Sequence, residues 1–235
     1  MVVSLSIIRY PKKFIPMAYL AMALHRIPLL LTKRCSFWKL LGCGKNGTFD
    51  IQPDHQQWGL MAVWENEIDF INFKQHSFIA KWWRFFGEEQ WTVLLEPTES
   101  HGKWSGKKPF GDPKIRGHEG MVGVLTRATI RPTKLKNFWK NVPKVSAIMG
   151  DAKGFITSVG IGEAPLMMQA TFSVWESLED VKTFAYKDAA HAEVIQLTRK
   201  EDWYSEELFA RFKILKSEGT LNGKDPLISI KNSIH

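Results

Sequence analysis

One histidine in the second half of the chain, His191, has surroundings that suit a flat, metal-containing ligand. It shares one face of a predicted helix with three apolar residues, Val181, Phe184 and Ile195. The residues next to it are small, namely Ala189, Ala190 and Ala192. Neutral imidazole is a common ligand of haem iron, so His191 is a candidate axial ligand. The alternative is a core or rim histidine with a hydrogen-bond partner.

Two polar residues on predicted strands could act beside such a ligand, and we take them as candidate catalytic residues. Arg127 lies on the strand Val122–Ile130, and Arg131 follows it. An arginine can bind a propionate or another carboxylate through two hydrogen bonds, although Arg127 could equally be a paired structural residue. Gln169 lies on the polar face of the strand Met168–Trp175, where its amide could donate a hydrogen bond to bound oxygen.

Two short motifs have competing explanations. The segment Gly42–Gly47 matches the dinucleotide pattern G-x-G-x-x-G, but residues 48–57 are polar and contain Pro53, so no helix is expected to receive a pyrophosphate. We interpret it as a turn. His191-Ala-Glu193 matches part of the zinc deaminase pattern, but no cysteine follows position 43 to supply the remaining ligands.

Composition indicates a globular protein with a basic surface. Hydrophobic residues make up 44% of the chain, and the formal net charge is +8. Such a charge suits an anionic membrane, an acidic protein or nucleic acid, but the basic residues are scattered and no nucleic-acid signature is present, so we expect no nucleic-acid partner. The two cysteines, Cys35 and Cys43, form no disulfide framework, which favours a reducing, cytoplasmic location.

An apolar segment near the start of the chain, residues 14–31, is interrupted by Pro16, His25, Arg26 and Pro28. Its clean apolar stretches are too short to cross a bilayer. We therefore interpret it as a helix of a soluble protein that can also touch a membrane surface.

An internal repeat organises these elements. Residues 37–44 and 155–162 both read F-x4-G-x-G, and the sequence V-W-E recurs at 63–65 and 174–176. Gly102 and Gly106 of the first copy correspond to Gly219 and Gly223 of the second. Aligned through Phe73 and Phe184, the first copy has Ala80 where the second has His191, so a haem bound through this position would be held by the second copy alone, one per chain.

Each copy shows the order β-α-β-β-α-β, which is the ferredoxin-like order. The predicted elements of the first copy are Val2–Arg9, Lys13–Arg26, Phe37–Leu41, Trp58–Trp64, Ile68–Phe86 and Trp91–Leu95. Those of the second copy are Val122–Ile130, Thr133–Met149, Gly154–Val159, Met168–Trp175, Leu178–Thr198 and Leu208–Leu215. We therefore predict an α+β fold made by tandem duplication of a ferredoxin-like βαββαβ unit, with halves 1–102 and 121–235 and a linker 103–120.

The chain resembles the spheroidene monooxygenase family of carotenoid biosynthesis. The resemblance runs from about Val2 to Leu215 and depends on the order of several motifs, which include residues 37–42, 102–106, 125–132, 159–165, 171–175 and 206–212. It implies a haem protein of the dimeric α/β-barrel type, with haem b as its cofactor. Such an enzyme uses O2 and reduced ferredoxin to place a keto group on an acyclic carotenoid such as spheroidene, by two hydroxylations of one carbon.

Other haem proteins of this type carry the axial histidine on the second helix of a ferredoxin-like unit, the element that contains His191. The resemblance therefore implies His191 as the iron ligand, with a haem site formed by Phe184, Ala192, Ile195 and Arg131. It also implies a lipophilic substrate, with peripheral contact at the inner membrane face and a homo-oligomer as further options. Three alternatives stay open: another haem enzyme, of the aldoxime-dehydratase or haem-degrading kind; a haem or lipid carrier; and a cofactor-free binding domain.

Overall fold

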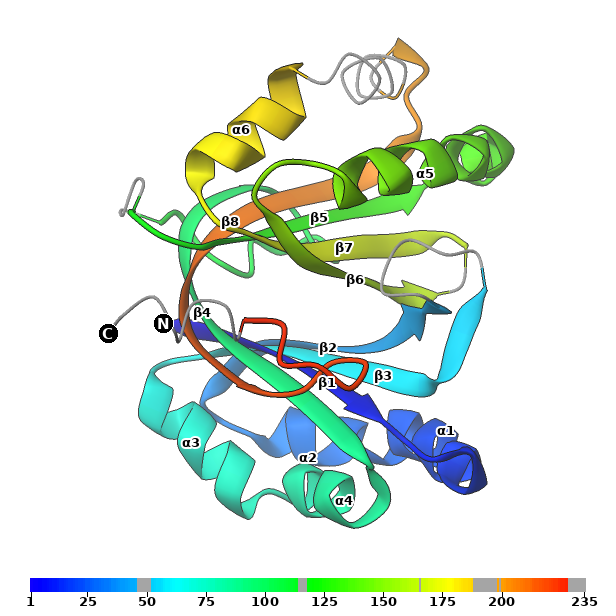
Figure 1. Cartoon of the computed structure of the whole chain (residues 1–235). Helices are drawn as coiled ribbons and strands as arrows, with labels where there is room; N and C mark the ends of the chain where they lie inside the picture. The colour runs from blue at the N-terminus through cyan, green and yellow to red at the C-terminus, as the bar shows by residue number, and fades with distance from the viewer. Residues whose placement is uncertain (46–51, 114–117, 165, 188–197, 199, 228–235) are drawn as a thin grey trace. The chain divides into compact units, whose positions relative to one another are not determined.

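The computed structural model describes residues 1–45, 52–113, 118–164, 166–187, 198 and 200–227. The chain divides into two compact units. The first contains Met1–Gly42, Asp54–Glu96 and the chain from Ile214 onward, and the second contains Cys43–Pro53 and Pro97–Lys213. Each unit has a four-stranded antiparallel sheet with helices on one face (Figure 1). The predicted α+β class and the duplicated ferredoxin-like unit, the fold of the dimeric α/β-barrel type, are confirmed.

The first unit has the strand order β2-β3-β1-β4. Along the chain its elements are β1 (Val2–Arg9), α1 (Ile15–Leu24), α2 (Arg26–Leu31), β2 (Cys35–Gly44), β3 (Pro53–Trp64), α3 (Glu67–His76), α4 (Phe78–Phe86) and β4 (Glu89–Gly102). The central strand β1 is buried along almost its whole length. The helix-facing side of the sheet, with Ile8 of β1 and Leu60 and Trp64 of β3, forms one apolar core with residues of α1, α2, α3 and α4.

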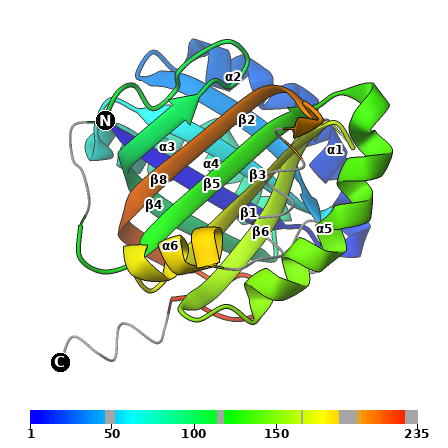
Figure 2. The ribbon, with the colours of Figure 1, turned by 90° about the horizontal axis from the view of Figure 1, so that it is seen from above.

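The second unit repeats this order, with α5 and α6 as the helices that have assigned bounds in its described part. Its elements are β5 (Val122–Ile130), α5 (Leu135–Gly150), β6 (Phe155–Ala164), β7 (Met168–Trp175), α6 (Leu178–Lys187) and β8 (Tyr204–Gly219), and its strand order is β6-β7-β5-β8. Two smaller apolar clusters join the sheet to the helices, one around Trp175 and the other around Trp203. Seen from above, the middle of β5 and β8 lies between α5 and α6 (Figure 2).

The compact units do not coincide with the halves that we expected from the sequence. The end of β4 and the predicted linker 103–120 belong to the second unit, where the N–H of Lys103 donates to the carbonyl of Glu207 at 2.8 Å. The chain after Lys213 belongs to the first unit, where the N–H of Thr220 donates to the carbonyl of Gln90 at 3.0 Å. Strands β4 and β8 are long, 14 and 16 residues, and each runs from one unit into the other.

Three local predictions need correction. The expected helix Ile68–Phe86 is broken at Ser77, whose extended backbone ends α3 and whose hydroxyl accepts a hydrogen bond from the N–H of Ala80 at the start of α4. The first helical segment continues through Pro28 to Leu31 as α2. The interpretation of Gly42 and Gly44 as turn residues is wrong, because both lie in strand β2.

Candidate functional site

The helix-facing side of the second sheet is open at its centre. Thr126 is exposed although it lies in the middle of β5, a strand with neighbours on both sides. It stands opposite Thr171 of β7 and Phe209 of β8. Because successive side chains of a strand alternate between faces, Thr126 lies on the same face as Val124, which packs with Val181 of α6. The opening is therefore on the face that carries the helices.

Beside Thr126, the positions on β7 and β6 carry mostly small side chains, while Phe209 of β8 lies on its other side. Cross-strand pairing places Gly160, Thr171 and Thr126 in one row, and Gly162, Gln169 and Ala128 in the next. The hydroxyl oxygen of Thr171 is buried and has no hydrogen-bond partner among the described residues. An unpaired buried hydroxyl is costly, and a bound group with a polar atom above this row would satisfy it.

Aromatic rings border these rows. Phe184 of α6 lies against Trp175 of β7, with ring centroids 5.1 Å apart, and Met149 of α5 joins the same apolar cluster. The indole N–H of Trp175 donates to the hydroxyl of Ser173 at 2.9 Å, so its polar edge is satisfied locally. Phe184, one of the predicted cofactor contacts, thus lies on the open face.

The other predicted residue on this face is Gln169. Its amide nitrogen donates to the carbonyl of Ala164 at 3.2 Å. Gly162 makes room for this amide, because a β-carbon there would lie 3.2 Å from the amide nitrogen and 2.8 Å from the carbonyl oxygen of Met168. The side chain of Gln169 is therefore held beside the row that contains Ala128.

Arg127 lies on the opposite face of the sheet, and the structure does not bring it together with Gln169. It is 2% exposed and pairs with Glu206, and its second amino group lies 3.5 Å from Glu163. Its guanidinium also stacks 5.7 Å from the Trp104 ring. Such contacts are typical of a paired structural arginine, which is the alternative that the sequence left open for Arg127. The catalytic role of Arg127 stays a prediction.

Glu206 links Arg127 to a tight turn. It accepts hydrogen bonds from the N–H groups of Ser105 at 2.9 Å and Gly106 at 2.7 Å. Burial alone would raise the pKa of Glu206, but these hydrogen bonds and the charge of Arg127 outweigh it and hold the pKa below its usual value. The network fixes the end of β4 in the second unit.

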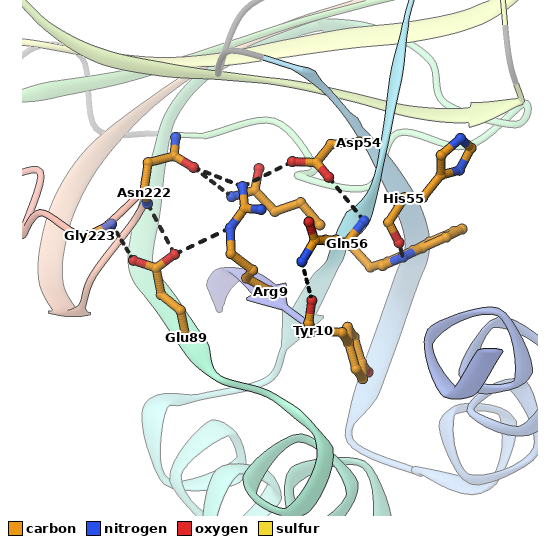
Figure 3. A network of polar contacts seen from close by, with 10 residues as sticks. Arg9, Tyr10, Asp54, His55, Gln56, Glu89, Asn222 and Gly223 are labelled. Atoms are coloured by element: carbon orange, nitrogen blue, oxygen red, sulfur yellow. Dashed lines mark hydrogen bonds and ion pairs between the residues drawn. The ribbon is translucent and has the colours of Figure 1, made fainter. Parts of the chain in front are cut away.

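The first unit repeats this clamp (Figure 3). Glu89 accepts hydrogen bonds from the N–H groups of Asn222 at 3.2 Å and Gly223 at 2.6 Å, and lies 3.6 Å from the Arg9 guanidinium. Arg9 also pairs with Asp54 at 2.9 Å. Glu89 and Glu206 thus hold equivalent turns, so this cluster is structural and belongs to the duplicated architecture.

The remaining predicted residues fall at the edge or outside the described part of the chain. Arg131 follows β5 and binds Asp202 twice, through its Nε to the backbone carbonyl at 3.1 Å and through a terminal nitrogen to the carboxylate at 3.0 Å. His191, Ala192 and Ile195 lie outside the described residues, beyond the last residue of α6. Among the residues that the structure describes, no cluster of histidine, cysteine and acidic side chains could hold a metal ion.

A cavity of about 560 Å³ lies on the same helix-facing side of the second sheet, beside Val122 of β5 and Leu178 of α6. It is lined by Glu99, His101, Lys182 and Arg211, among others, and Arg211 pairs with Glu99. Burying an apolar chain against these charged groups would cost desolvation energy, so this cavity does not suit a lipophilic ligand.

The same face of the first unit is closed. Ser6 corresponds to Thr126 in the repeat, but it is 5% exposed and shares a 2.9 Å hydrogen bond with the hydroxyl of Thr92. Ile8, which corresponds to Ala128, is 1% exposed within the core. The sequence comparison missed this difference because both copies contain the same glycine motif. The sequence does record the difference on the central strand, where Ser6 and Ile8 of the first copy correspond to Thr126 and Ala128 of the second.

Comparison with known proteins agrees with this fold. Residues 121–212 match a family model described as a domain of unknown function, DUF3291. The chain is 36% identical over 231 residues to spheroidene monooxygenase of Rhodobacter capsulatus, covering 97% of this chain and 96% of that one. It is 35% identical over 198 residues to the enzyme of the same name from Rubrivivax gelatinosus, covering 84% and 75%. A crystal structure of an aldoxime dehydratase with butyraldoxime has a TM-score of 0.61 at 13% identity, over 96% of this chain and 84% of that one. This last likeness shows the fold alone.

Proposed function

Because the chain belongs to the spheroidene monooxygenase family, we propose that it is an oxidoreductase that uses O2 to oxidise an acyclic carotenoid such as spheroidene. We further propose that it carries haem b on the open face of the second sheet and takes electrons from reduced ferredoxin. The observation that carries the site is the exposed Thr126 at the centre of that sheet.

The residues of the open face fit a flat ligand. Gly160, Gly162 and Ala128 keep the two rows low on the β6 side of Phe209, and the buried hydroxyl of Thr171 has no partner among the described residues. Phe184 and Trp175 supply an apolar border that excludes water. His191 is the proposed iron ligand, on the chain that continues from α6, and Arg131 is the proposed partner of a propionate. When bound, haem supplies the activation of O2, which no side chain can provide.

The residues of the chain contribute position and polarity to this reaction. Thr171 and Gln169 can orient a polar atom above the sheet, because both carry donors and lie in adjacent rows. Gln169 would supply the hydrogen-bond donor on the side of the site where O2 is activated. Each hydroxylation uses one O2, two electrons and two protons. One oxygen atom is inserted into a C–H bond to give an alcohol, and the other leaves as water. A second hydroxylation of the same carbon gives a geminal diol, which loses water to form the keto group.

The proposed partners follow from the family and from the charge of the chain. Reduced ferredoxin supplies the electrons, and the net charge of +8 favours an acidic protein partner of this kind. The proposed location is the cytoplasm, with peripheral contact at the inner membrane face and assembly into a homo-oligomer.

The open face can be tested by its capacity to bind haem. We expect reconstituted protein to show a Soret band, and Thr126→Trp to lose it because the indole fills the face. Thr126→Ser is the matched control and should keep the band. Position 126 is exposed, so the circular dichroism spectrum of both variants should be that of the wild-type protein. Normal haem binding by Thr126→Trp would place the cofactor elsewhere, and no Soret band in the wild-type protein would refute the haem proposal.

The ligand and the reaction need separate measurements. His191→Ala should remove or shift the Soret band, and an unchanged spectrum would show that another residue binds the iron. Carotenoid incubated with O2, ferredoxin and its reductase should gain oxygen mass. Haem that is consumed by reductant and O2 alone would instead favour a haem-degrading enzyme.

A further inference from the structure

The start of the chain has an unusual charge distribution. Residues 1–49 contain eight basic residues and no acidic one, although the whole chain has 24 acidic residues. The basic residues that flank α1 and α2 are exposed, namely Lys12, Lys13, Arg26, Lys33 and Arg34. Arg34 pairs with Asp69 at 3.4 Å and Arg9 with Asp54 at 2.9 Å, but residues 1–49 by themselves carry only positive charge.

The same segment exposes large apolar side chains. On α2, Ile27 is 62% exposed, and Leu30 and Leu31 are both 74% exposed. On α1, Leu20 is 43% exposed, and on α4 Phe85 is 75% exposed. Single exposed apolar residues are ordinary on soluble proteins, but several on adjacent helices indicate an interaction site.

Helix α4 packs beside the junction of α1 and α2 in the first unit. His25, at the junction of α1 and α2, packs edge-on against Phe78 and Trp82 of α4, with ring centroids 6.1 and 5.7 Å apart. Phe14 packs against Phe86 at the other end of α4, 5.2 Å apart. We use the name apolar surface for the large apolar residues that these three helices expose: Leu20, Leu24, Ile27, Leu30, Leu31, Phe78 and Phe85.

We infer that the apolar surface docks on an anionic lipid bilayer, with its side chains in the outer boundary of the acyl region and the surrounding lysines and arginines on the headgroups. Interfacial helices bind by this combination of buried apolar area and attraction to anionic lipid. The inference concerns a surface that the proposed reaction does not use. It would bring the second unit to the membrane where a lipophilic substrate dissolves, and only that consequence rests on the proposed function.

Docking on the surface fits the structure better than crossing the bilayer. The segment Lys12–Leu31 is long and apolar enough to span a membrane by length and composition. However, α1 ends at Leu24 and a charged residue, Arg26, begins α2. Ala18, Ala21 and Leu29 are buried in the unit, so the segment is already part of a folded core on one side.

A bilayer also fits better than a second copy of the chain. A symmetric dimer through the apolar surface would place the exposed basic residues of both copies close together, because each copy contributes the same patch. Like charges across an interface disfavour association, whereas anionic headgroups would neutralise them.

Sedimentation with lipid vesicles tests the docking without haem or substrate. We expect the full chain to bind vesicles of phosphatidylcholine and phosphatidylglycerol, and to bind pure phosphatidylcholine at least tenfold more weakly. The double variant Leu30→Glu, Leu31→Glu should bind the mixed vesicles at least tenfold more weakly, because two exposed apolar side chains no longer enter the lipid. Leu215→Glu, at a residue 40% exposed on β8, is the matched control and should bind like the wild-type chain.

Several outcomes would overturn the inference. The inference is wrong if the wild-type protein stays in the supernatant with the mixed vesicles, or if the double variant binds those vesicles as well as the wild type does. A wild-type dimer that the double variant dissociates would assign the surface to a second copy, and bound protein that resists an alkaline carbonate wash would indicate a spanning helix. Soluble variants with a normal Soret band and carotenoid turnover in detergent would separate a failure of docking from a failure of the proposed function.

Discussion

The buried histidine behind the apolar surface should make folding stability depend on pH. His25 is 2% exposed, and its Nε2 has no hydrogen-bond partner among the described residues. The rings of Phe78, Trp82 and Trp83 surround it, with centroids 5.7 to 6.2 Å away. Desolvation lowers the pKa of His25 from 6.5 to about 4, because the charged imidazolium would lose its water without gaining a partner.

The sign and size follow from proton linkage. In the unfolded chain the imidazole takes up a proton near pH 6.5, whereas the folded chain does not until about pH 4. Stability therefore falls as the pH drops through this window. The difference between the two pKa values corresponds to about 3 kcal/mol in total, and to about 2 kcal/mol of it by about pH 5. The pKa values of Glu206 and Glu218 are lowered, so the stability that these carboxylates contribute is lost as the pH falls below their ordinary value of 4.5. The loss of stability between pH 6.5 and pH 4.5 therefore reports on His25.

Urea unfolding at about pH 7.5 and about pH 5 measures this effect. We expect the wild-type free energy of unfolding to fall by about 2 kcal/mol more than that of His25→Phe, since phenylalanine keeps the ring packing and cannot be protonated. His76→Gln, on the exposed end of α3, is the control and should keep the wild-type pH dependence. If His25→Phe and wild type lose the same free energy at about pH 5, His25 does not titrate as its burial requires.

Two further substitutions test the second unit. Arg127→Leu should destabilise the protein by about 3 to 5 kcal/mol in urea unfolding, because it leaves two partly buried carboxylates without their cation; a loss below about 1 kcal/mol would show that the network contributes little. Gly102→Ala should also destabilise strongly, since Gly102 has φ of +85° and a β-carbon there would lie 2.2 Å from the carbonyl oxygen of Glu207. Gly106→Ala is the control, because Gly106 has φ of +73° but no atom lies within 4 Å of the added carbon. It should lose only the smaller amount of stability that its backbone conformation costs. Equal losses of stability for the two variants in thermal unfolding would contradict the packing argument.

Strand alternation and the internal repeat allow much of the fold to be predicted. The predicted strands Val2–Arg9, Val122–Ile130 and Met168–Trp175 match the observed β1, β5 and β7. These strands have apolar residues that must face a core, so local pattern and tertiary packing agree. The prediction failed at polar strand ends: β4 continues past Leu95 to Gly102, because pairing partners rather than apolar side chains hold the extension.

The sequence alone also determined which residue types were available to a site, and its resemblance to the spheroidene monooxygenases identified the family. It could not determine which of those residues meet. Arg127 and Gln169 are on neighbouring strands of one sheet, yet alternation and register put them on opposite faces. Likewise, both copies carry the same glycine motif, but Ser6 is buried on the helix-facing side of the first sheet, whereas its counterpart Thr126 is exposed on the second. Only the packing of helices on the sheet decides this, because an opening is defined by side chains that come from distant parts of the chain.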